Sequence, residues 1–165
     1  MQQRVQALAA QFAEANAAIK RLVESCTEAQ WQTPCVVGEW SVCVTVHHII
    51  NGYDQEGWVA ALIAAILAGK ALPEHPADSH PERDYNEWYT QQFATRTKDE
   101  ALALLRQNEA AGLRLIEGLQ DADLDKTAPA SSERKPVSVQ RIIEHILINH
   151  AQEHLKSLRA TLEAE

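Results

Sequence analysis

Residues 139–162 have the sequence VQRIIEHILINHAQEHLKSLRATL, which contains neither glycine nor proline. Pro136 and Ser138 stand just before this stretch, and such residues are typical of a helix start. Apolar side chains then recur every three or four positions, which is the spacing that places them on one face of a helix. On that face lie Val139, Ile142, Ile143, Ile146 and Leu147. The stretch therefore predicts a long helix with one buried face.

His150 and His154 fall near the middle of the same face, where a plain bundle helix carries leucine or isoleucine. Residues four apart lie one above the other on a helix, so the two imidazoles can point at one atom. Imidazole is the commonest metal-binding side chain, and the pair suits one edge of a coordination sphere. The alternative is a pair of core histidines, although burying both without a shared partner is costly. His145 points well away from this face and is expected at the surface.

The composition is that of one compact domain spanning residues 1–165, because 45% of the residues are hydrophobic and can form a sizeable core. The formal net charge of −8 argues against a nucleic-acid partner, which requires a basic face. No secretory signal is apparent at the N-terminus. The most apolar segment, residues 58–67, is too short to span a bilayer, so we expect no membrane partner.

Three cysteines, Cys26, Cys35 and Cys43, lack Cys-x-x-Cys spacing and are odd in number. This pattern predicts reduced thiols and a cytoplasmic protein. Cys43 lies one helical turn before His47, so an alternative is a metal site in which these two residues provide two of the ligands. The two residues alone do not form a recognised zinc pattern.

Helical spacing extends over the rest of the chain. Capping boxes at Thr27 and Thr97 and a serine cap at Ser41 predict three helix starts. Residues 71–83, with three prolines, are expected to form an irregular loop over the domain, and the polar residues 121–136 are expected to be the crossover into the last helix. Long helices are predicted over residues 1–25, 41–67, 97–118 and 139–162, with shorter ones over 27–31 and 84–96. Without a strand pattern, these segments predict an all-α four-helix bundle with one or two long crossover connections.

Periodicity does not decide which histidine of the second helix points inward, because apolar residues cover nearly its whole circumference. This segment has one apolar face in its first half and another in its second half, and His48 lies on the second of these faces. The early face comprises Val46, Ile49, Ile50 and Tyr53, and the later one Val59, Leu62 and Ile66. His47 and His48 therefore remain alternatives on this argument.

Other polar residues have no motif that assigns them a role. His75 and His80 fall in a proline-rich loop and are expected to be solvated. Asp54, Glu56 and Glu153 are close in sequence to the candidate histidines and are possible general bases. Carboxylates on helices are usually solvated, so none is named as catalytic.

With these motifs in place, the chain resembles the DinB/YfiT-like superfamily of four-helix bundles over nearly its whole length. One shared feature is Gly38-Glu-Trp40-Ser41 at the start of the second helix, with a histidine eight residues after the tryptophan. Another is the crossover and helix restart around residues 97–105. The third is the His-x-x-x-His pair at His150 and His154.

The resemblance implies a divalent metal bound by three histidines. Counting eight residues from Trp40 gives His48 rather than His47, so the implied ligands are His48, His150 and His154. Three imidazoles suit zinc or nickel and leave coordination positions open. Trp40 is expected to be a core anchor at the helix start rather than a substrate contact.

The resemblance also suggests a function, because the superfamily includes thiol transferases and a mycothiol-dependent maleylpyruvate isomerase. It implies a metal-dependent enzyme of thiol transfer or detoxification that acts on a small-molecule substrate with a low-molecular-weight thiol. A metal-dependent hydrolase is one alternative, and a non-catalytic, stress-linked binding or dimerisation module is another. A homodimer is a further expectation, since bundles of this superfamily often self-associate and residues 58–67 are strongly apolar. Burial of that segment within its own bundle is the alternative.

Overall fold

The computed structural model describes residues 2–36, 38, 40–52, 57–74, 84–129 and 136–164. Helices make up most of this part of the chain, and only isolated bridge pairs, no strands, occur within it. In chain order the helices are α1 (Gln3–Ser25), α2 (Glu28–Gln32), α3 (Val42–Gly52), α4 (Trp58–Leu67), α5 (Tyr85–Phe93), α6 (Lys98–Glu117), η2 (Asp123–Asp125), α7 (Val139–Ile142), η3 (Ile143–Asn149) and α8 (His150–Glu163). The predicted all-α class is confirmed.

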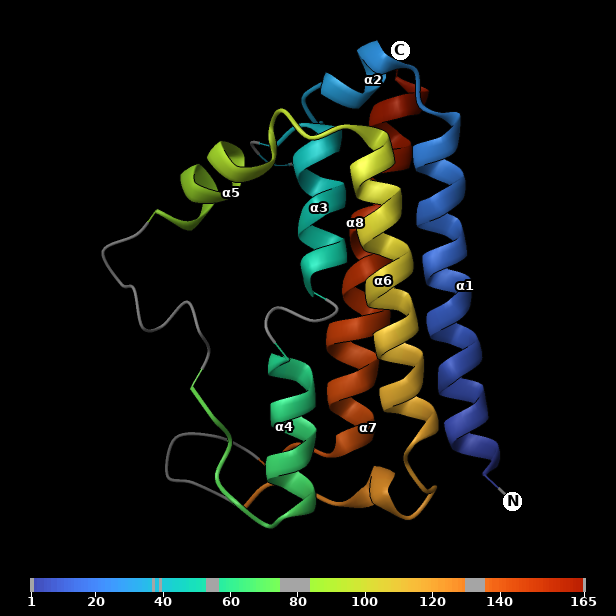
Figure 1. Cartoon of the computed structure of the whole chain (residues 1–165), viewed down its shortest axis with the longest axis vertical. Coiled ribbons are helices and arrows are strands. Elements are labelled where there is room, and N and C mark those ends of the chain that lie inside the picture. Colours follow the sequence, from blue (N-terminus) through green and yellow to red (C-terminus); the bar gives the residue numbers. More distant parts are fainter. Residues whose placement is uncertain are drawn as a thin grey trace.

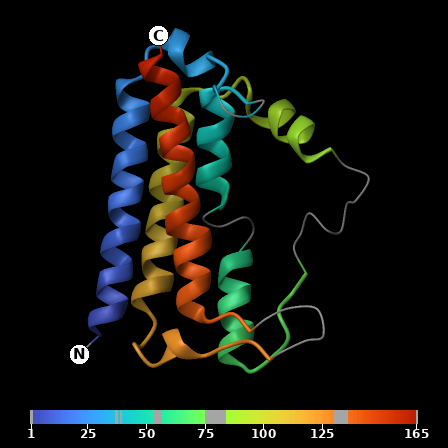
Figure 2. The same ribbon diagram turned by 180° about the vertical axis from the view of Figure 1, so that it is seen from behind.

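The bundle consists of four helical segments packed side by side (Figures 1 and 2). They are α1, α3 continued by α4, α6, and the unbroken helix made by α7, η3 and α8. α1 packs against α6 and α8, and α3 packs against the same two helices from the other side. α1 and α8 run in one direction along the long axis, while α3 and α6 run in the other. Because α3 and α6 are parallel, the chain between them has to return along the length of the bundle. That return agrees with the crossover expected before the restart at Thr97. The crossover predicted over residues 121–136 is wrong, because α6 and the last helix run in opposite directions and need no return along the bundle.

Several helices begin where their caps predict. The Thr27 hydroxyl accepts a hydrogen bond from the Gln30 backbone N–H, and the Gln30 side chain accepts one from the Thr27 N–H. Thr97 and Glu100 form the same reciprocal pair at the start of α6. Ser138 accepts from a backbone N–H at the start of the last helix. These caps satisfy N–H groups that a helix start leaves unpaired.

The predicted continuous helix over residues 41–67 is wrong. α3 ends at Gly52, and α4 begins at Trp58 after Gly57, whose φ of 75° is left-handed. An α-helix cannot continue through a left-handed residue, and glycine adopts that conformation without a steric penalty. α4 nevertheless lies roughly in line with α3 (Figure 1). Asp54 and Glu56 lie outside the described residues. The helix predicted to reach residue 96 also ends early, at Phe93.

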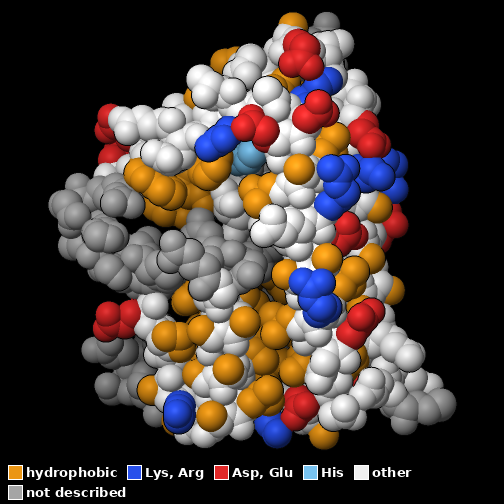
Figure 3. All heavy atoms as spheres, in the orientation of Figure 1, with side chains coloured by type: hydrophobic (Ala, Val, Ile, Leu, Met, Phe, Trp, Pro, Cys, Tyr) orange, Lys and Arg blue, Asp and Glu red, His pale blue; other side chains and the backbone are white. Residues whose placement is uncertain are grey.

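α4 contains only apolar residues, and its larger ones face inward. Val59, Leu62, Ile63 and Ile66 are buried, whereas the outer side consists mostly of alanines with Leu67 at 37% exposure. Figure 3 shows apolar side chains gathered over the lower half of the molecule, where α4 lies. Burial within its own bundle therefore accounts for most of the segment, and the homodimer stays a prediction. Among the helices described, none combines the length and apolarity that a membrane span needs.

The last helix runs without a break from Val139 to Glu163, as predicted, but its middle is not α-helical. Residues of η3 form a π-helical segment, in which the N–H of His150 donates to the carbonyl of His145. The wider turn of a π-helix changes the angle between successive side chains. As a result Ile148, which is not on the predicted apolar face, is buried, and Ile146 is only half-buried. α8 begins directly after this segment, at His150.

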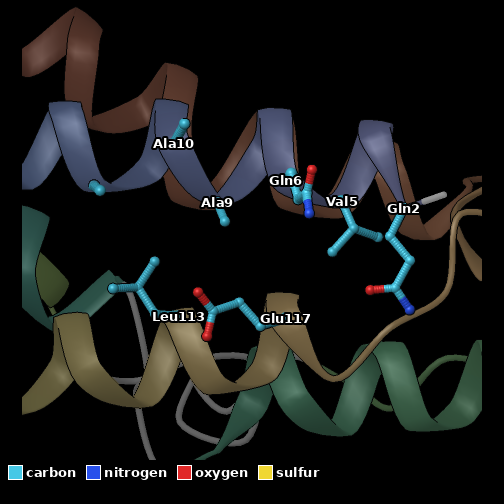
Figure 4. Close-up of a pocket in the computed structure, with 8 residues that line it drawn as sticks. Gln2, Val5, Gln6, Ala9, Ala10, Leu113 and Glu117 are labelled. Carbon is cyan, nitrogen blue, oxygen red and sulfur yellow. The ribbon is translucent and has the colours of Figure 1, made fainter.

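α1 and α6 approach each other closely at one point and leave a groove at another. Phe12 is fully buried, and its ring lies where a Cβ atom on Gly112 would be, 2.6–2.7 Å from two ring carbons. Nearer the N-terminus, an open groove of about 500 Å³ separates the two helices (Figure 4). The groove is lined by Gln2, Val5, Gln6, Ala9, Ala10, Ala13, Leu113 and Glu117. The candidate histidines do not line it.

Replacing Gly112 by alanine is expected to destabilise the bundle. Alanine favours a helix over glycine by about 1 kcal/mol. Overpacking a tight core contact costs about 1–3 kcal/mol, and the added Cβ would meet the fully buried ring of Phe12. We expect a net loss of about 1 kcal/mol and a Tm roughly 3 °C lower in thermal unfolding. Gly118→Ala is the control, since its Cβ meets no atom closer than 3.2 Å. An unchanged or raised Tm for Gly112→Ala would show that the contact is not tight.

Candidate metal centre

Three histidines from two helices converge beside the core. His48 comes from α3, and His150 and His154 lie one turn apart on α8. The Nε2 atom of His150 lies 3.0 Å from that of His48 and 3.2 Å from that of His154. All three rings are half-buried, and the potential ligand atoms lie within 4.8 Å of one another. Within the described ranges, no other group of three histidine, cysteine or acidic side chains is placed to share an ion.

The donor set fits a divalent cation better than it fits a hydrogen-bond network. An imidazole nitrogen has a single in-plane position, occupied by a proton or by a lone pair. Nε2 of His150 therefore cannot form good hydrogen bonds to both neighbours at once. Two nitrogens bound to one tetrahedral zinc at about 2.0–2.1 Å would lie roughly 3.3 Å apart, which is close to the observed separations.

The electrostatic environment keeps these imidazoles neutral. Burial is the main cause that lowers the pKa of His48 to about 3, and the nearby rings of His150 and His154 lower it further. Burial also lowers the pKa of His150 to about 4, with a second contribution from His154. The pKa of His154 is lowered by burial, while the carboxylate of Glu153 acts in the opposite direction. Near neutral pH each lone pair is therefore available to a cation.

His47 points into the core and away from the cluster. Its side chain is 2% exposed, and neither ring nitrogen has a hydrogen-bond partner among the described residues. The ring stacks on Phe93 at 5.0 Å, with Trp31 at its edge. Burial, followed by the nearby positive charge of Arg96, lowers the pKa of His47 to about 4. The structure thus brings His48, not His47, to the histidines of α8.

The alternative metal site at Cys43 and His47 is not supported. The Cys43 thiol donates to the backbone carbonyls of Phe93 and Arg96. Burial raises the pKa of this thiol to about 11, which disfavours the thiolate that a metal would need. Cys26 and Cys35 are also buried, and neither forms a disulfide among the described residues.

The remaining candidates are peripheral or outside the description. His145 is exposed, as predicted, and Glu153 is also exposed. Neither joins the cluster of three histidines. His75 and His80 lie outside the described residues.

Two aromatic residues adjoin the cluster in a way that sequence reasoning missed. Trp40, expected to be a core anchor, is half-buried, and its ring lies 4.8 Å from that of His48. Tyr89 of α5 is fully buried, with its ring 5.3 Å from His48. The aromatic face of α5 was visible in the sequence. Its contact with His48 was not, because the two residues are 41 positions apart.

Several solved structures share this fold. One is YfiT from Bacillus subtilis, described as a probable metal-dependent hydrolase with an unusual four-helix bundle topology, at a TM-score of 0.71 and 17% identity over 99% of this chain and 89% of that one. The mycothiol-dependent maleylpyruvate isomerase aligns at a TM-score of 0.65 and 13% identity, over 93% of this chain and 60% of that one. At sequence identities this low, the structural similarity establishes a common fold only.

A third similar structure is the colibactin self-resistance protein ClbS in complex with double-stranded DNA, at a TM-score of 0.68 and 17% identity over 98% of this chain and 96% of that one. Among curated protein sequences, none matches the chain significantly. The family model of the DinB superfamily matches residues 11–158, which include all three converging histidines. From this match and the shared fold, the chain belongs to the DinB superfamily.

Proposed function

We propose that the chain is a metal-dependent enzyme in which His48, His150 and His154 hold a divalent cation, zinc or nickel, that activates a low-molecular-weight thiol. The observation that carries this proposal is the convergence of three neutral imidazole nitrogens from two helices on one point. Local sequence spacing explains only the pair on α8. The third imidazole, from α3, is explained if the lone pairs of all three rings bind one ion.

The charge balance favours an anionic ligand. Three neutral imidazoles leave the double positive charge of the cation uncompensated, and no carboxylate joins the cluster within the described part of the chain. A bound divalent cation of this kind has open positions and lowers the pKa of a thiol or of a water molecule placed there. The protein's part is to hold the three imidazoles neutral and aligned, and their lowered pKa values serve that purpose.

Two of the structures with a similar fold support different reactions for this chain. The isomerase that depends on mycothiol supports a thiol-dependent transfer or detoxification reaction. YfiT, described as a probable metal-dependent hydrolase, supports a second candidate in which water replaces the thiol. A third alternative is a metal-binding, stress-linked module without turnover. We favour the thiol reaction because the uncompensated charge suits a thiolate.

The partners we propose are a small-molecule substrate and a small thiol, in the cytoplasm. None of the three cysteines forms a disulfide in the described part of the chain, in keeping with a reducing compartment. ClbS was solved with DNA, but this chain carries a net charge of −8, which opposes binding to a polyanion. We therefore do not extend nucleic-acid binding to it.

Cobalt substitution tests the proposal directly. With Co²⁺ in place of the native ion, addition of a small thiol at neutral pH should produce a sulfur-to-metal charge-transfer band in the near ultraviolet. The band should appear with an apparent pKa below the usual value of the thiol, because the thiolate is the ligand. His154→Ala should abolish it, and His145→Ala, which alters an exposed residue outside the cluster, should not.

The outcomes separate the three candidates. A cobalt spectrum that stays unchanged with several saturating biological thiols would rule out the thiol reaction. Ester or amide cleavage with a titration near neutrality and no thiol requirement would then favour the hydrolase. Stoichiometric cobalt binding with neither response would favour the binding module.

A further inference from the structure

The ring of His48 is held by packing rather than by a hydrogen bond to its second nitrogen. Its Nδ1 atom is buried and has no hydrogen-bond partner among the residues that the structure describes. A metal-binding histidine usually donates this N–H to a carboxylate, a carbonyl or water, which fixes the orientation of the ring. Some other contact therefore has to limit the rotation of His48.

Two aromatic rings make that contact. Tyr89 meets the imidazole at 5.3 Å and 75°, in an edge-to-face arrangement, and Trp40 meets it at 4.8 Å and 50°. Trp40 and Tyr89 also pack on each other, at 5.4 Å. With the rings of His150 and His154 at 4.9 and 5.0 Å, the imidazole touches four rings. Rotation of His48 would have to displace at least one of them.

Tyr89 is itself firmly placed. It is fully buried, and its ring packs against three others on its own helix, those of Tyr85, Trp88 and Phe93. Trp40 is tied to the same helix, since its indole N–H donates to the backbone carbonyl of Asn86 at 3.2 Å. Figure 1 shows α5 set to one side of the bundle beside α3, the helix that carries His48. The position of α5 is thus coupled to the orientation of one imidazole.

We propose that Tyr89 is a positioning residue whose ring, braced by Trp40, holds His48 with its Nε2 atom facing those of His150 and His154. This inference rests on the proposed metal site. It concerns the packing of the Tyr89 ring and assigns no role to the hydroxyl. Because coupling between two binding events is reciprocal, an ion at the histidines must in turn hold α5 more firmly against α3.

Zinc affinity of three variants tests the role of the ring, measured by competition with a chromophoric chelator. Tyr89→Ala should bind zinc about tenfold more weakly than the unaltered protein, the smaller end of the loss expected when an outer partner of a ligand is removed. Tyr89→Phe keeps the ring and should restore the affinity. Trp31→Ala is the matched control, because it removes a buried ring that packs beside His47 rather than beside His48 or Tyr89. Its zinc affinity should be almost unchanged.

A second measurement needs no variant that could fail to fold. Amide hydrogen exchange over residues 85–93 of the unaltered protein should slow when zinc saturates the site. Unchanged exchange there, or equal zinc affinity for Tyr89→Ala and the unaltered protein, would overturn the inference. So would an equal loss in Trp31→Ala or in Tyr89→Phe. Failure of the unaltered protein to bind zinc at all would instead refute the metal site on which the inference rests.

Discussion

Replacing His150 by alanine is expected to abolish stoichiometric binding of zinc or nickel. Its Nε2 atom is the central one of the three, at 3.0 Å from that of His48 and 3.2 Å from that of His154. Without it, two imidazoles from different helices remain, which is fewer than the three protein ligands typical of a catalytic zinc. Metal content per folded protein, measured on material purified without an affinity tag, checks this result.

Two pairs of variants give the controls. His145→Ala changes an exposed histidine five residues earlier and should leave metal content intact. His48→Ala should lose the ion, whereas His47→Ala should retain it, provided that circular dichroism shows that the variant still folds. Full metal content in both His150→Ala and His48→Ala would refute the three-histidine site. Loss in His47→Ala alone would transfer the ligand role to His47.

The metal-free protein is expected to lose stability steeply as the pH falls below about 6.5. His47, His48 and His150 have pKa values of about 4, 3 and 4 in the folded chain, whereas an unfolded histidine has a pKa of about 6.5. Between these values the unfolded chain binds protons that the folded chain does not, so acidification favours unfolding. The stabilisation from the neutral rings is therefore complete above about pH 6.5 and is lost toward pH 4.

The expected slope is on the order of 1 kcal/mol per pH unit for each of these histidines, with a reduction from the full linkage value for His48 and His150, which are only half-buried. Urea unfolding between pH 7.5 and 5 in the presence of a chelator measures it. His47→Leu keeps an apolar side chain in the core and removes one titrating group, so the slope should fall by about a third. A free energy of unfolding independent of pH over this range would show that the histidines are not buried in their neutral form.

Features set by neighbouring residues could be predicted from the sequence. The capping boxes at Thr27 and Thr97 place helix starts because their hydrogen bonds join residues three apart. The pair His150 and His154 shares a helix face because residues four apart always do. The resemblance placed a crossover before the helix restart around residues 97–105, and the parallel course of α3 and α6 agrees with it.

Backbone irregularities could not be predicted with the same certainty, because they depend on packing as well as on local preference. Gly57 was present in the sequence, but a glycine is tolerated within a helix, and nothing nearby shows that its φ becomes 75°. The π-helical turn of η3 is equally hidden, since residues 143–149 have an ordinary helical composition. Both features interrupt the regular rotation of about 100° per residue in an α-helix, from which the buried helix faces were predicted.

The helical class, most helix boundaries and the paired imidazoles of α8 follow from the sequence, because each depends on contacts within a few residues. Periodicity left His47 and His48 as alternatives, because both lie on a helix that is apolar nearly all round, and the resemblance favoured His48. The tertiary packing shows which of the two side chains meets the histidines of α8. Packing against Phe93 and Trp31 turns His47 into the core. The approach of α8 and the rings of Trp40 and Tyr89 place His48 in the cluster. Apart from those of the two tryptophans, these contacts join residues 41 to 102 positions apart along the chain, and periodicity carries no information over those separations.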